Sequence, residues 1–184
     1  MNKTIGLFGV ALHSTNYGVT ALGISQIAML ESIAQEIGST FKYIIFSGES
    51  KEETDCIKKY IPVEKVEFVD IVRIKTGLKG IQSLKNIQKC DVVIDLTYGD
   101  SFSDIYGMKN FVLYSVPKII TEKLHIPLIL GPQTYGPFKS KIAEHLAKRM
   151  LKNMDYIFAR DDESAQQVIR LIPKKRVCVT SDLA

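Results

Sequence analysis

The chain has 184 residues, and its 24 Lys and Arg against 20 Asp and Glu give a formal net charge of +4. With 46% hydrophobic and 24% charged residues, the composition is that of a globular protein and excludes a disordered one. This length predicts a single domain spanning residues 1–184. The positive charge is too small for a dedicated nucleic-acid binder, so we expect no nucleic-acid partner.

Cysteine usage and hydropathy favour a cytoplasmic protein. Cys56, Cys90 and Cys178 are too widely spaced for a metal-binding pair and odd in number for a disulfide framework, which fits a reducing compartment. Residues 4–30 carry no charge, but the polar stretch 13–18 would lie at the centre of any membrane span there. We therefore expect a buried first strand in this region and no transmembrane segment.

Short apolar runs alternate with helical patterns along the whole chain. Seven runs rich in Val, Ile, Leu and Phe are predicted strands: 3–12, 41–47, 65–71, 91–97, 127–131, 156–159 and 176–180. Apolar residues at helical spacing predict helices in five segments, the last two with weaker patterns: 19–37, 139–153, 165–172, 51–60 and 80–89. Pro117 interrupts a further pattern at 106–124, which predicts a kink or a new helix there. This alternation predicts an α/β fold with a Rossmann-like, doubly wound and mostly parallel sheet.

In an open α/β sheet, ligands bind beyond the carboxyl ends of the strands, so the loops at those ends are the candidate sites. The loop after the first strand enters a helix, whose free N–H groups favour an anion. It contains neither GxGxxG nor a P-loop motif. The sequence alone favours a structural role for this loop, in which Asn16 and Gly18 form the turn and either Thr20 or Asn16 caps the helix.

Carboxylates, hydroxyls and glycines crowd the loop 95–107 after the fourth strand, among them Gly99, Asp100, Ser101 and Asp104. Closely spaced carboxylates can divide general acid and general base work, and they can bind sugar hydroxyls or a divalent cation. Turn formation and helix capping are the alternative. The number of polar groups at one strand end favours a functional role.

Two further loops carry candidate binding groups. Gln133 and Thr134 lie between two Gly–Pro pairs, which hold their donors and acceptors in a rigid loop, and a structural role is equally supported. Arg160 ends the sixth strand, where it can clamp a carboxylate or phosphate. It can equally pair with Asp161 or with an acidic side chain of the 95–107 loop. Asp161 is expected to cap the following helix.

Four stretches, in this order, resemble the polysaccharide pyruvyl transferase family: NYGVTAL at 16–22, GDSFSD at 99–104, LGPQTYGPF at 130–138 and FARD at 158–161, with Ser164. The closing residues 181–184 resemble the segment that leads out of the family's first domain. Two positions depart from the family pattern. The family often has Gly-Asp after the early Asn, where this chain has Gly18-Val19, and Gly-Gly where this chain has Tyr98-Gly99.

The resemblance implies two Rossmann-like domains facing across a cleft, similar to GT-B glycosyltransferases. This chain would be the N-terminal, acceptor-side half, with the C-terminal domain absent from it. The implied reaction transfers the enolpyruvyl part of phosphoenolpyruvate, a co-substrate, to a sugar hydroxyl as a ketal in cell-surface polysaccharide biosynthesis. No cofactor or metal is implied, and the acceptor would be a sugar or a lipid-linked oligosaccharide. Because half a cleft does not exclude water, we expect the chain alone to be inactive. Peripheral membrane association and oligomerisation stay open.

Under this resemblance, Asp100 or Asp104 serves the acceptor hydroxyl as the acid–base group, and Arg160 holds a phosphate or carboxylate or fixes the acidic loop. Eight further residues are expected to bind substrate: Asn16, Gly18, Gly99, Ser101, Gln133, Thr134, Gly136 and Asp161. Two alternatives stay open. One is a GT-B-type glycosyltransferase domain that uses a nucleotide sugar, and the other is a non-catalytic sugar-binding or assembly module.

Overall fold

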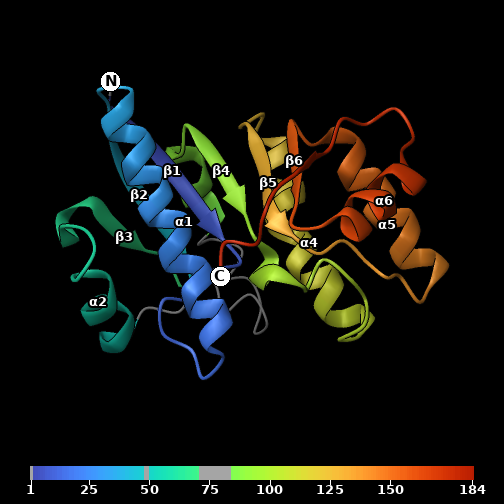
Figure 1. Cartoon of the computed structure of the whole chain (residues 1–184), viewed down its shortest axis with the longest axis horizontal. Coiled ribbons are helices and arrows are strands. Elements are labelled where there is room, and N and C mark those ends of the chain that lie inside the picture. The colour runs from blue at the N-terminus through green and yellow to red at the C-terminus, as the bar shows by residue number, and fades with distance from the viewer. Residues whose placement is uncertain (1, 48–49, 71–83) are drawn as a thin grey trace.

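The computed structural model describes residues 2–47, 50–70 and 84–184, and within them seven strands form one sheet (Figure 1). In chain order the strands are β1 Asn2–Phe8, β2 Thr40–Phe46, β3 Val66–Phe68, β4 Val92–Asp95, β5 Leu128–Gln133, β6 Tyr156–Ala159 and β7 Cys178–Val179. They lie in the order β3-β2-β1-β4-β5-β6-β7, and every neighbouring pair is parallel. The predicted Rossmann-like α/β class is confirmed, and the sheet is parallel throughout.

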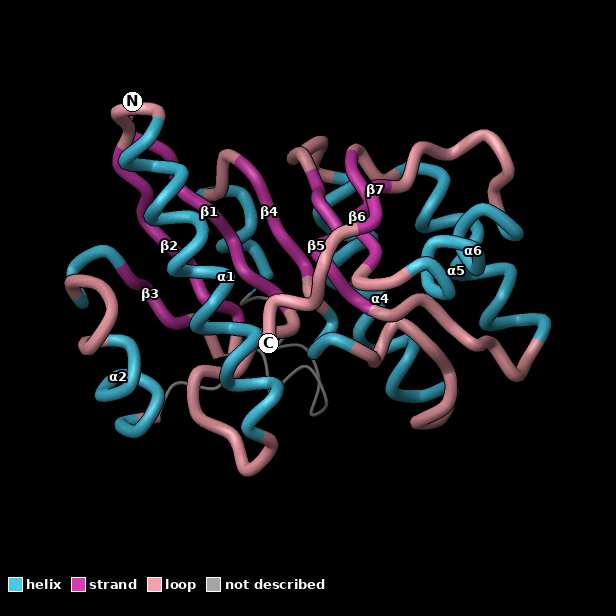
Figure 2. Tube along the Cα trace, viewed as in Figure 1, coloured by secondary structure: helices cyan, strands magenta, loops and turns pink. Residues whose placement is uncertain are grey.

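Helices connect the strands and cover both faces of the sheet (Figure 2). The α-helices are α1 Tyr17–Glu36, α2 Lys51–Ile57, α4 Met108–Lys123, α5 Lys141–Asn153 and α6 Asp162–Leu171. Three 3₁₀ turns are also described: η1 Val63–Lys65, η3 Leu84–Lys89 and η4 Thr97–Gly99. Of the weak helical pattern at 80–89, residues 80–83 lie outside the described residues, and the remainder is the 3₁₀ turn η3.

Alternate residues of the central strands enter two separate cores. Ile5 and Leu7 of β1 pack in one core with α1 residues such as Ile27. Phe8, the next residue along, packs in the other core with residues of α4, α5 and α6, including Phe111. Because both faces of the sheet are covered, both sets of strand residues must be apolar, which explains the continuous apolar runs in the sequence.

The first strand is shorter than its apolar run because Gly9 turns the chain. The strand was expected to reach residue 12 but ends at Phe8, and Gly9 has φ +65°. A Cβ at Gly9 would lie 2.2 Å from the backbone nitrogen of Thr97, so only glycine lets the two loops approach this closely. The third and seventh strands are also shorter than predicted, and residue 71 lies outside the described residues.

Pro117 lies inside one continuous helix, α4, so of the two expectations, a kink or a new helix, the new helix is wrong. Proline leaves one carbonyl of the preceding turn without its helical donor. Around that point, the side chains of Ser115, Lys118 and Thr121 each donate to the carbonyl four residues earlier. None of these bonds reaches the carbonyl of Leu113, which is the one that Pro117 leaves without a helical donor.

No helix in the described ranges has the length and apolarity needed to cross a membrane. The segment 4–30, which carries no charge, instead contributes most of β1 and most of α1. All three cysteines are free thiols, with Cys90 buried and Cys56 and Cys178 half-buried.

Candidate functional site

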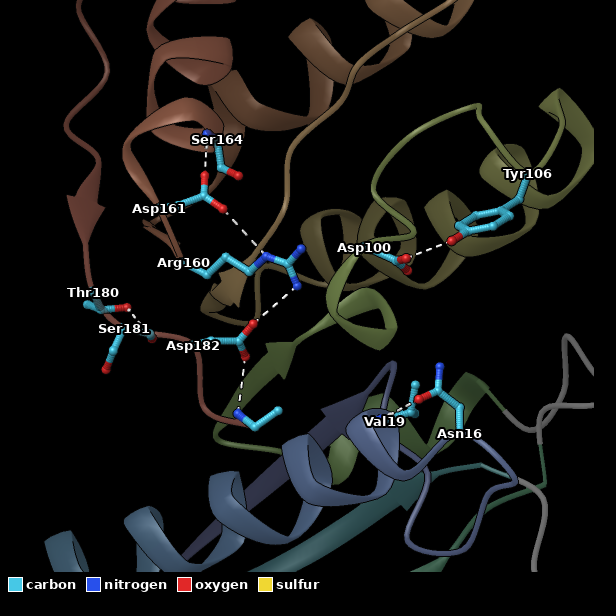
Figure 3. Close-up of polar contacts among 11 residues, drawn as sticks. Asn16, Val19, Asp100, Tyr106, Arg160, Asp161, Ser164, Thr180, Ser181 and Asp182 are labelled. Atoms are coloured by element: carbon cyan, nitrogen blue, oxygen red, sulfur yellow. Dashed lines mark hydrogen bonds and ion pairs between the residues drawn. The ribbon is translucent and has the colours of Figure 1, made fainter.

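An open cleft of about 230 Å³ lies at the carboxyl edge of the sheet, where the loops after β1, β4 and β6 meet the segment that follows β7. The strand order reverses between β1 and β4, which is where an α/β sheet forms its binding crevice. Ten residues line it: Asn16, Gly18, Val19, Leu22, Tyr98, Gly99, Asp100, Arg160, Asp182 and Ala184. Five of the predicted site residues therefore come together in one cleft. Figure 3 shows three of them, Asn16, Asp100 and Arg160.

The N-terminus of α1 forms one wall of the cleft. Asn16 caps it, with Oδ1 accepting hydrogen bonds from the backbone N–H groups of Gly18 at 3.0 Å and Val19 at 3.4 Å. Of the two expected caps, Thr20 and Asn16, the structure shows Asn16, and the capped turn also faces the cleft (Figure 3). The first turn of α1 contains no acidic residue, so its positive dipole end remains available to an anion.

Asp100 brings a half-buried carboxylate to the opposite wall. Tyr106 donates its phenolic hydrogen to Oδ2 at 2.6 Å, and Ser101 donates to Oδ1 at 3.2 Å. The bond to Asp100 raises the pKa of Tyr106, a residue that is otherwise exposed. Ser101 therefore holds the carboxylate and does not line the cleft. Sequence reasoning missed Tyr106, because a spacing of six residues in an irregular loop does not predict a contact.

The backbone before Asp100 forms a left-handed turn. Thr97, Tyr98 and Gly99 have φ angles of 41°, 55° and 88°, so three consecutive residues occupy a region that most side chains avoid. Tyr98 packs edge-on against Tyr114, with ring centroids 5.5 Å apart, and burial raises the pKa of its phenol to about 12. Tyr98 itself is one of the residues that line the cleft.

Arg160 faces Asp182 across the mouth of the cleft. Its Nη1 lies 3.1 Å from Asp182 Oδ2, and its Nε lies 3.6 Å from Asp161 Oδ2 (Figure 3). The predicted pairing with Asp161 is confirmed. Among the described residues, no ion pair joins Arg160 to the acidic loop, although its guanidinium lies 4.0 Å from where a Cβ of Gly99 would be. Sequence reasoning missed Asp182, which lies 22 residues further along and reaches Arg160 only because β7 pairs with β6.

The remaining predicted residues support the cleft from outside its lining. Asp104 is buried, and its two oxygens accept the backbone N–H groups of Lys139 at 2.7 Å and Ser140 at 2.9 Å, just before α5. Gln133 is fully buried and donates to the carbonyl of Asp95 at 3.0 Å. The arrangement therefore favours Asp100 over Asp104 as the group that meets a ligand.

Two other predicted residues, in the loop after β5, bind the backbone of the 95–107 loop and do not line the cleft. The backbone N–H of Thr134 donates to the carbonyl of Gly99 at 2.8 Å, which ties the loop after β5 to the cleft wall. Gly136 has φ +72°, a conformation that glycine adopts freely. Within the ranges 2–47, 50–70 and 84–184, no group of three His, Cys, Asp or Glu side chains is arranged to hold a metal ion.

Asp161 caps α6, and this cap makes a pH-dependent prediction. Its Oδ1 accepts the N–H of Ser164 at 2.7 Å, and hydrogen bonds from Ser164 lower the pKa of Asp161. A lowered folded-state pKa contributes stability above the unfolded pKa, and that contribution is lost as the pH falls through the folded value. Asp161→Ala is expected to lower the free energy of unfolding by about 1 kcal/mol at neutral pH. The difference between wild type and this variant is expected to disappear as the pH falls below about 4.

Asp161→Asn is the matched control, because Asn is an equally good N-cap without a titrating charge. Urea denaturation of wild type, Asp161→Ala and Asp161→Asn at several pH values measures their free energies of unfolding. Asp161→Asn is expected to remain more stable than Asp161→Ala at low pH. A wild-type advantage over Asp161→Ala that stays constant through pH 3 would contradict this prediction.

Comparison with known proteins agrees with the resemblance seen in the sequence. The profile of the polysaccharide pyruvyl transferase family matches residues 26–184. The chain belongs to the polysaccharide pyruvyl transferase family. The match includes the loops that carry Asp100 and Arg160, whereas the loop with Asn16 precedes it.

A solved structure shares the fold of this family member. The chain superposes on Anabaena Alr3699/HepE, solved in complex with UDP and glucose, with a TM-score of 0.53 and 12% sequence identity. The alignment covers 98% of this chain and 44% of HepE, so the chain spans less than half the length of that protein. A search of curated proteins found no match.

Proposed function

We propose that the cleft binds the sugar acceptor of a pyruvyl transfer reaction, in which phosphoenolpyruvate donates its enolpyruvyl group to a sugar hydroxyl and a ketal forms. One observation carries the proposal. A single cleft holds a hydrogen-bonded carboxylate, Asp100, together with the guanidinium of Arg160 and the N-terminus of α1. This combination offers a proton acceptor for a hydroxyl and two positive groups for an anionic donor.

The chemistry assigns a role to each charged group. Protonation of the vinyl carbon of phosphoenolpyruvate creates an oxocarbenium-like centre, which the oxygen of the acceptor hydroxyl attacks as its proton leaves. Asp100 accepts this proton, and the hydrogen bonds from Ser101 and Tyr106 fix the direction of its carboxylate. Attack by a second hydroxyl of the same sugar on that carbon then displaces phosphate, which leaves with the proton of this hydroxyl, and the ketal closes. Arg160 and the N-terminus of α1 hold the phosphate or carboxylate of the donor.

A second domain completes this cleft in the proposed whole enzyme. The cleft is open, and the side chain of Arg160 is one-third exposed at its mouth. Exposed charges are screened by water, whereas transition-state stabilisation needs a site from which water is excluded. The similarity to HepE, of which this chain covers 44%, agrees with a larger enzyme but shows only the fold.

The test is a pyruvylation assay with phosphoenolpyruvate and a panel of nucleotide-linked and lipid-linked hexoses. The chain is assayed alone and in the longest protein that contains it. Phosphate release together with pyruvate-modified sugar, in the longer form, is the expected result. Transfer of the hexose from a nucleotide sugar, without pyruvate incorporation, would replace this function by glycosyl transfer. Saturable sugar binding with no reaction in either form would leave a binding module.

Arg160 provides a direct test of the anion contact. Arg160→Met is expected to weaken the binding of phosphoenolpyruvate by about 10–100-fold, because a charge-assisted hydrogen bond is lost. Titration calorimetry of both proteins measures the change. Arg170→Met is the matched control, since Arg170 also forms an ion pair, with Glu144 at 2.7 Å, and does not line the cleft. Equal affinity in the two variants would contradict the assignment of Arg160.

A further inference from the structure

A buried ion pair lies just behind the cleft. Nζ of Lys118 in α4 is 2.6 Å from Oδ2 of Asp95 at the end of β4, and the two side chains are 2% and 3% exposed. The same ammonium donates to the carbonyl of Tyr114 at 3.0 Å and lies 5.5 Å from the ring centroid of Phe102. Apolar residues of similar volume often stabilise a core as well as a buried ion pair does, so stability alone does not account for these charges.

The second oxygen of Asp95 holds the left-handed turn. Oδ1 accepts hydrogen bonds from the backbone N–H of Thr97 at 2.7 Å and from its hydroxyl at 2.8 Å. Thr97 is β-branched, a residue type for which positive φ is strongly unfavourable. Such a conformation persists only where the surroundings over-determine it. The N–H of Tyr98 adds a bond to the carbonyl of Gly9 at 2.8 Å, which fastens the turn to β1 as well.

The turn sets the position of the group proposed to accept the proton. Tyr98, Gly99 and Asp100 follow one another along the cleft wall, so the φ angles at 97–99 determine where the carboxylate of Asp100 lies. Phe102, whose ring lies under the Lys118 ammonium, follows Asp100 by two residues. Lys118 therefore contacts this loop on both sides of Asp100, through Asp95 before it and through the Phe102 ring after it.

We propose that Lys118 and Asp95 form a positioning pair, which keeps Thr97–Gly99 left-handed and thereby fixes the carboxylate of Asp100 in the cleft. Neither residue lines the cleft, so both act through the loop. The effect on the reaction rests on the proposed function of Asp100, whereas the effect on the turn does not. The two parts of the proposal therefore have separate measurements.

Asp95→Asn is the primary variant. In Asp95 the two partners use different oxygens, Lys118 at Oδ2 and Thr97 at Oδ1, and an amide keeps an oxygen at only one of these positions, so one contact must be lost. Asp91→Asn is the matched control at the opposite end of β4. Asp91 also accepts from a lysine, Lys3 at 2.8 Å, and from a backbone N–H, that of Thr4 at 2.8 Å, but the pair is exposed.

Three measurements separate positioning from stability. Melting temperature reports stability. NMR of the 184-residue chain reports φ at Thr97 and Tyr98 through the H–N–C–H couplings, and values typical of positive φ are called the left-handed couplings. The pyruvylation assay reports transfer. Asp95→Asn is expected to melt about 10 °C lower, because it leaves a buried charge poorly paired, to lose the left-handed couplings and to lower kcat at least 10-fold. Asp91→Asn should change the melting temperature by less than about 3 °C and leave the couplings and kcat unchanged.

Rescue distinguishes the two roles most sharply. Glycine adopts positive φ freely, so Asp95→Asn with Thr97→Gly is expected to regain the left-handed couplings and a kcat within about threefold of wild type. Its melting temperature should remain low, because the charge is still poorly paired. Wild-type couplings in Asp95→Asn, or a regained turn without regained kcat, would overturn the proposal.

A second variant covers the case in which Asp95→Asn does not fold. Thr97→Val keeps the ion pair and the shape of the side chain but removes the hydroxyl that donates to Asp95. Loss of the left-handed couplings with a small change in melting temperature is the expected result, and unchanged couplings would overturn the proposal. If no protein form transfers pyruvate, the proposed function fails, while the couplings still decide whether the pair holds the turn.

Discussion

Replacing Asp100 with Asn is expected to slow pyruvyl transfer by about 10²–10⁴-fold, the usual contribution of a positioned acid–base group. Asn keeps the size of the side chain and can still accept the hydrogen bond of Tyr106, so the loop is expected to hold its shape. It cannot take the proton of the acceptor hydroxyl. The loss should therefore appear in kcat, measured at saturating phosphoenolpyruvate and acceptor, rather than in KM.

Asp104→Asn is the matched control, because it removes a carboxylate of the same loop that does not line the cleft. Both oxygens of Asp104 accept backbone N–H groups at the start of α5, and the residue is buried. Its replacement is expected to lower the melting temperature and to leave the rate per folded molecule close to that of wild type. Full transfer activity in Asp100→Asn, or a larger loss of kcat in Asp104→Asn, would exclude Asp100 as the base.

Gly9→Ala is expected to be the most destabilising small substitution at the carboxyl edge of the sheet, with a loss of about 3 kcal/mol in the free energy of unfolding. Gly9 has φ +65°, and the added Cβ would lie 2.2 Å from the nitrogen and 2.5 Å from the Cα of Thr97. Backbone atoms cannot move aside as a flexible side chain can. Either the left-handed turn or the end of β1 must shift, as urea denaturation of both proteins would measure.

Gly38→Ala isolates the contribution of the close contact. Gly38 also has a positive φ of +60°, but nothing lies within 4 Å of the added Cβ. Only the cost of the left-handed backbone, about 1–2 kcal/mol, is expected there. The difference between the two variants measures how firmly β1 and the turn at Thr97 are held together. Equal losses in the free energy of unfolding at Gly9 and Gly38 would contradict this prediction, because they would show that the turn at Thr97 moves to accommodate the added Cβ without a free-energy penalty.

Several features of the cleft could be predicted because parallel strands end at the same edge of a sheet. Asn16, Asp100 and Arg160 each follow a predicted strand, and the fold brings all three into one cleft. No knowledge of the strand order was needed for that expectation. The confirmed pair of Arg160 with Asp161 was equally accessible, since the two residues are adjacent in the chain.

The order of strands and loops in the sequence does not predict the direction in which a side chain of an irregular loop points. Asp100 and Asp104 look equivalent in the sequence, yet one lines the cleft and the other holds the start of α5. The difference arises from the turn at Thr97 and from backbone groups 35 and 36 residues beyond Asp104. Local pattern contains neither of these.

The sequence by itself determined the α/β class, the existence of the seven strands, and the strand ends that carry polar groups. Apolar periodicity and chain order are local properties of the sequence. Because a parallel sheet is buried on both faces, its strands must be continuous apolar runs, and such runs can be recognised in the sequence. Only the tertiary structure decided that Lys118 pairs with Asp95 and that Asp182 meets Arg160. Both pairs join groups that are 22 or 23 residues apart, and the spacing of residues along the chain does not encode which of them the fold brings close enough to pair.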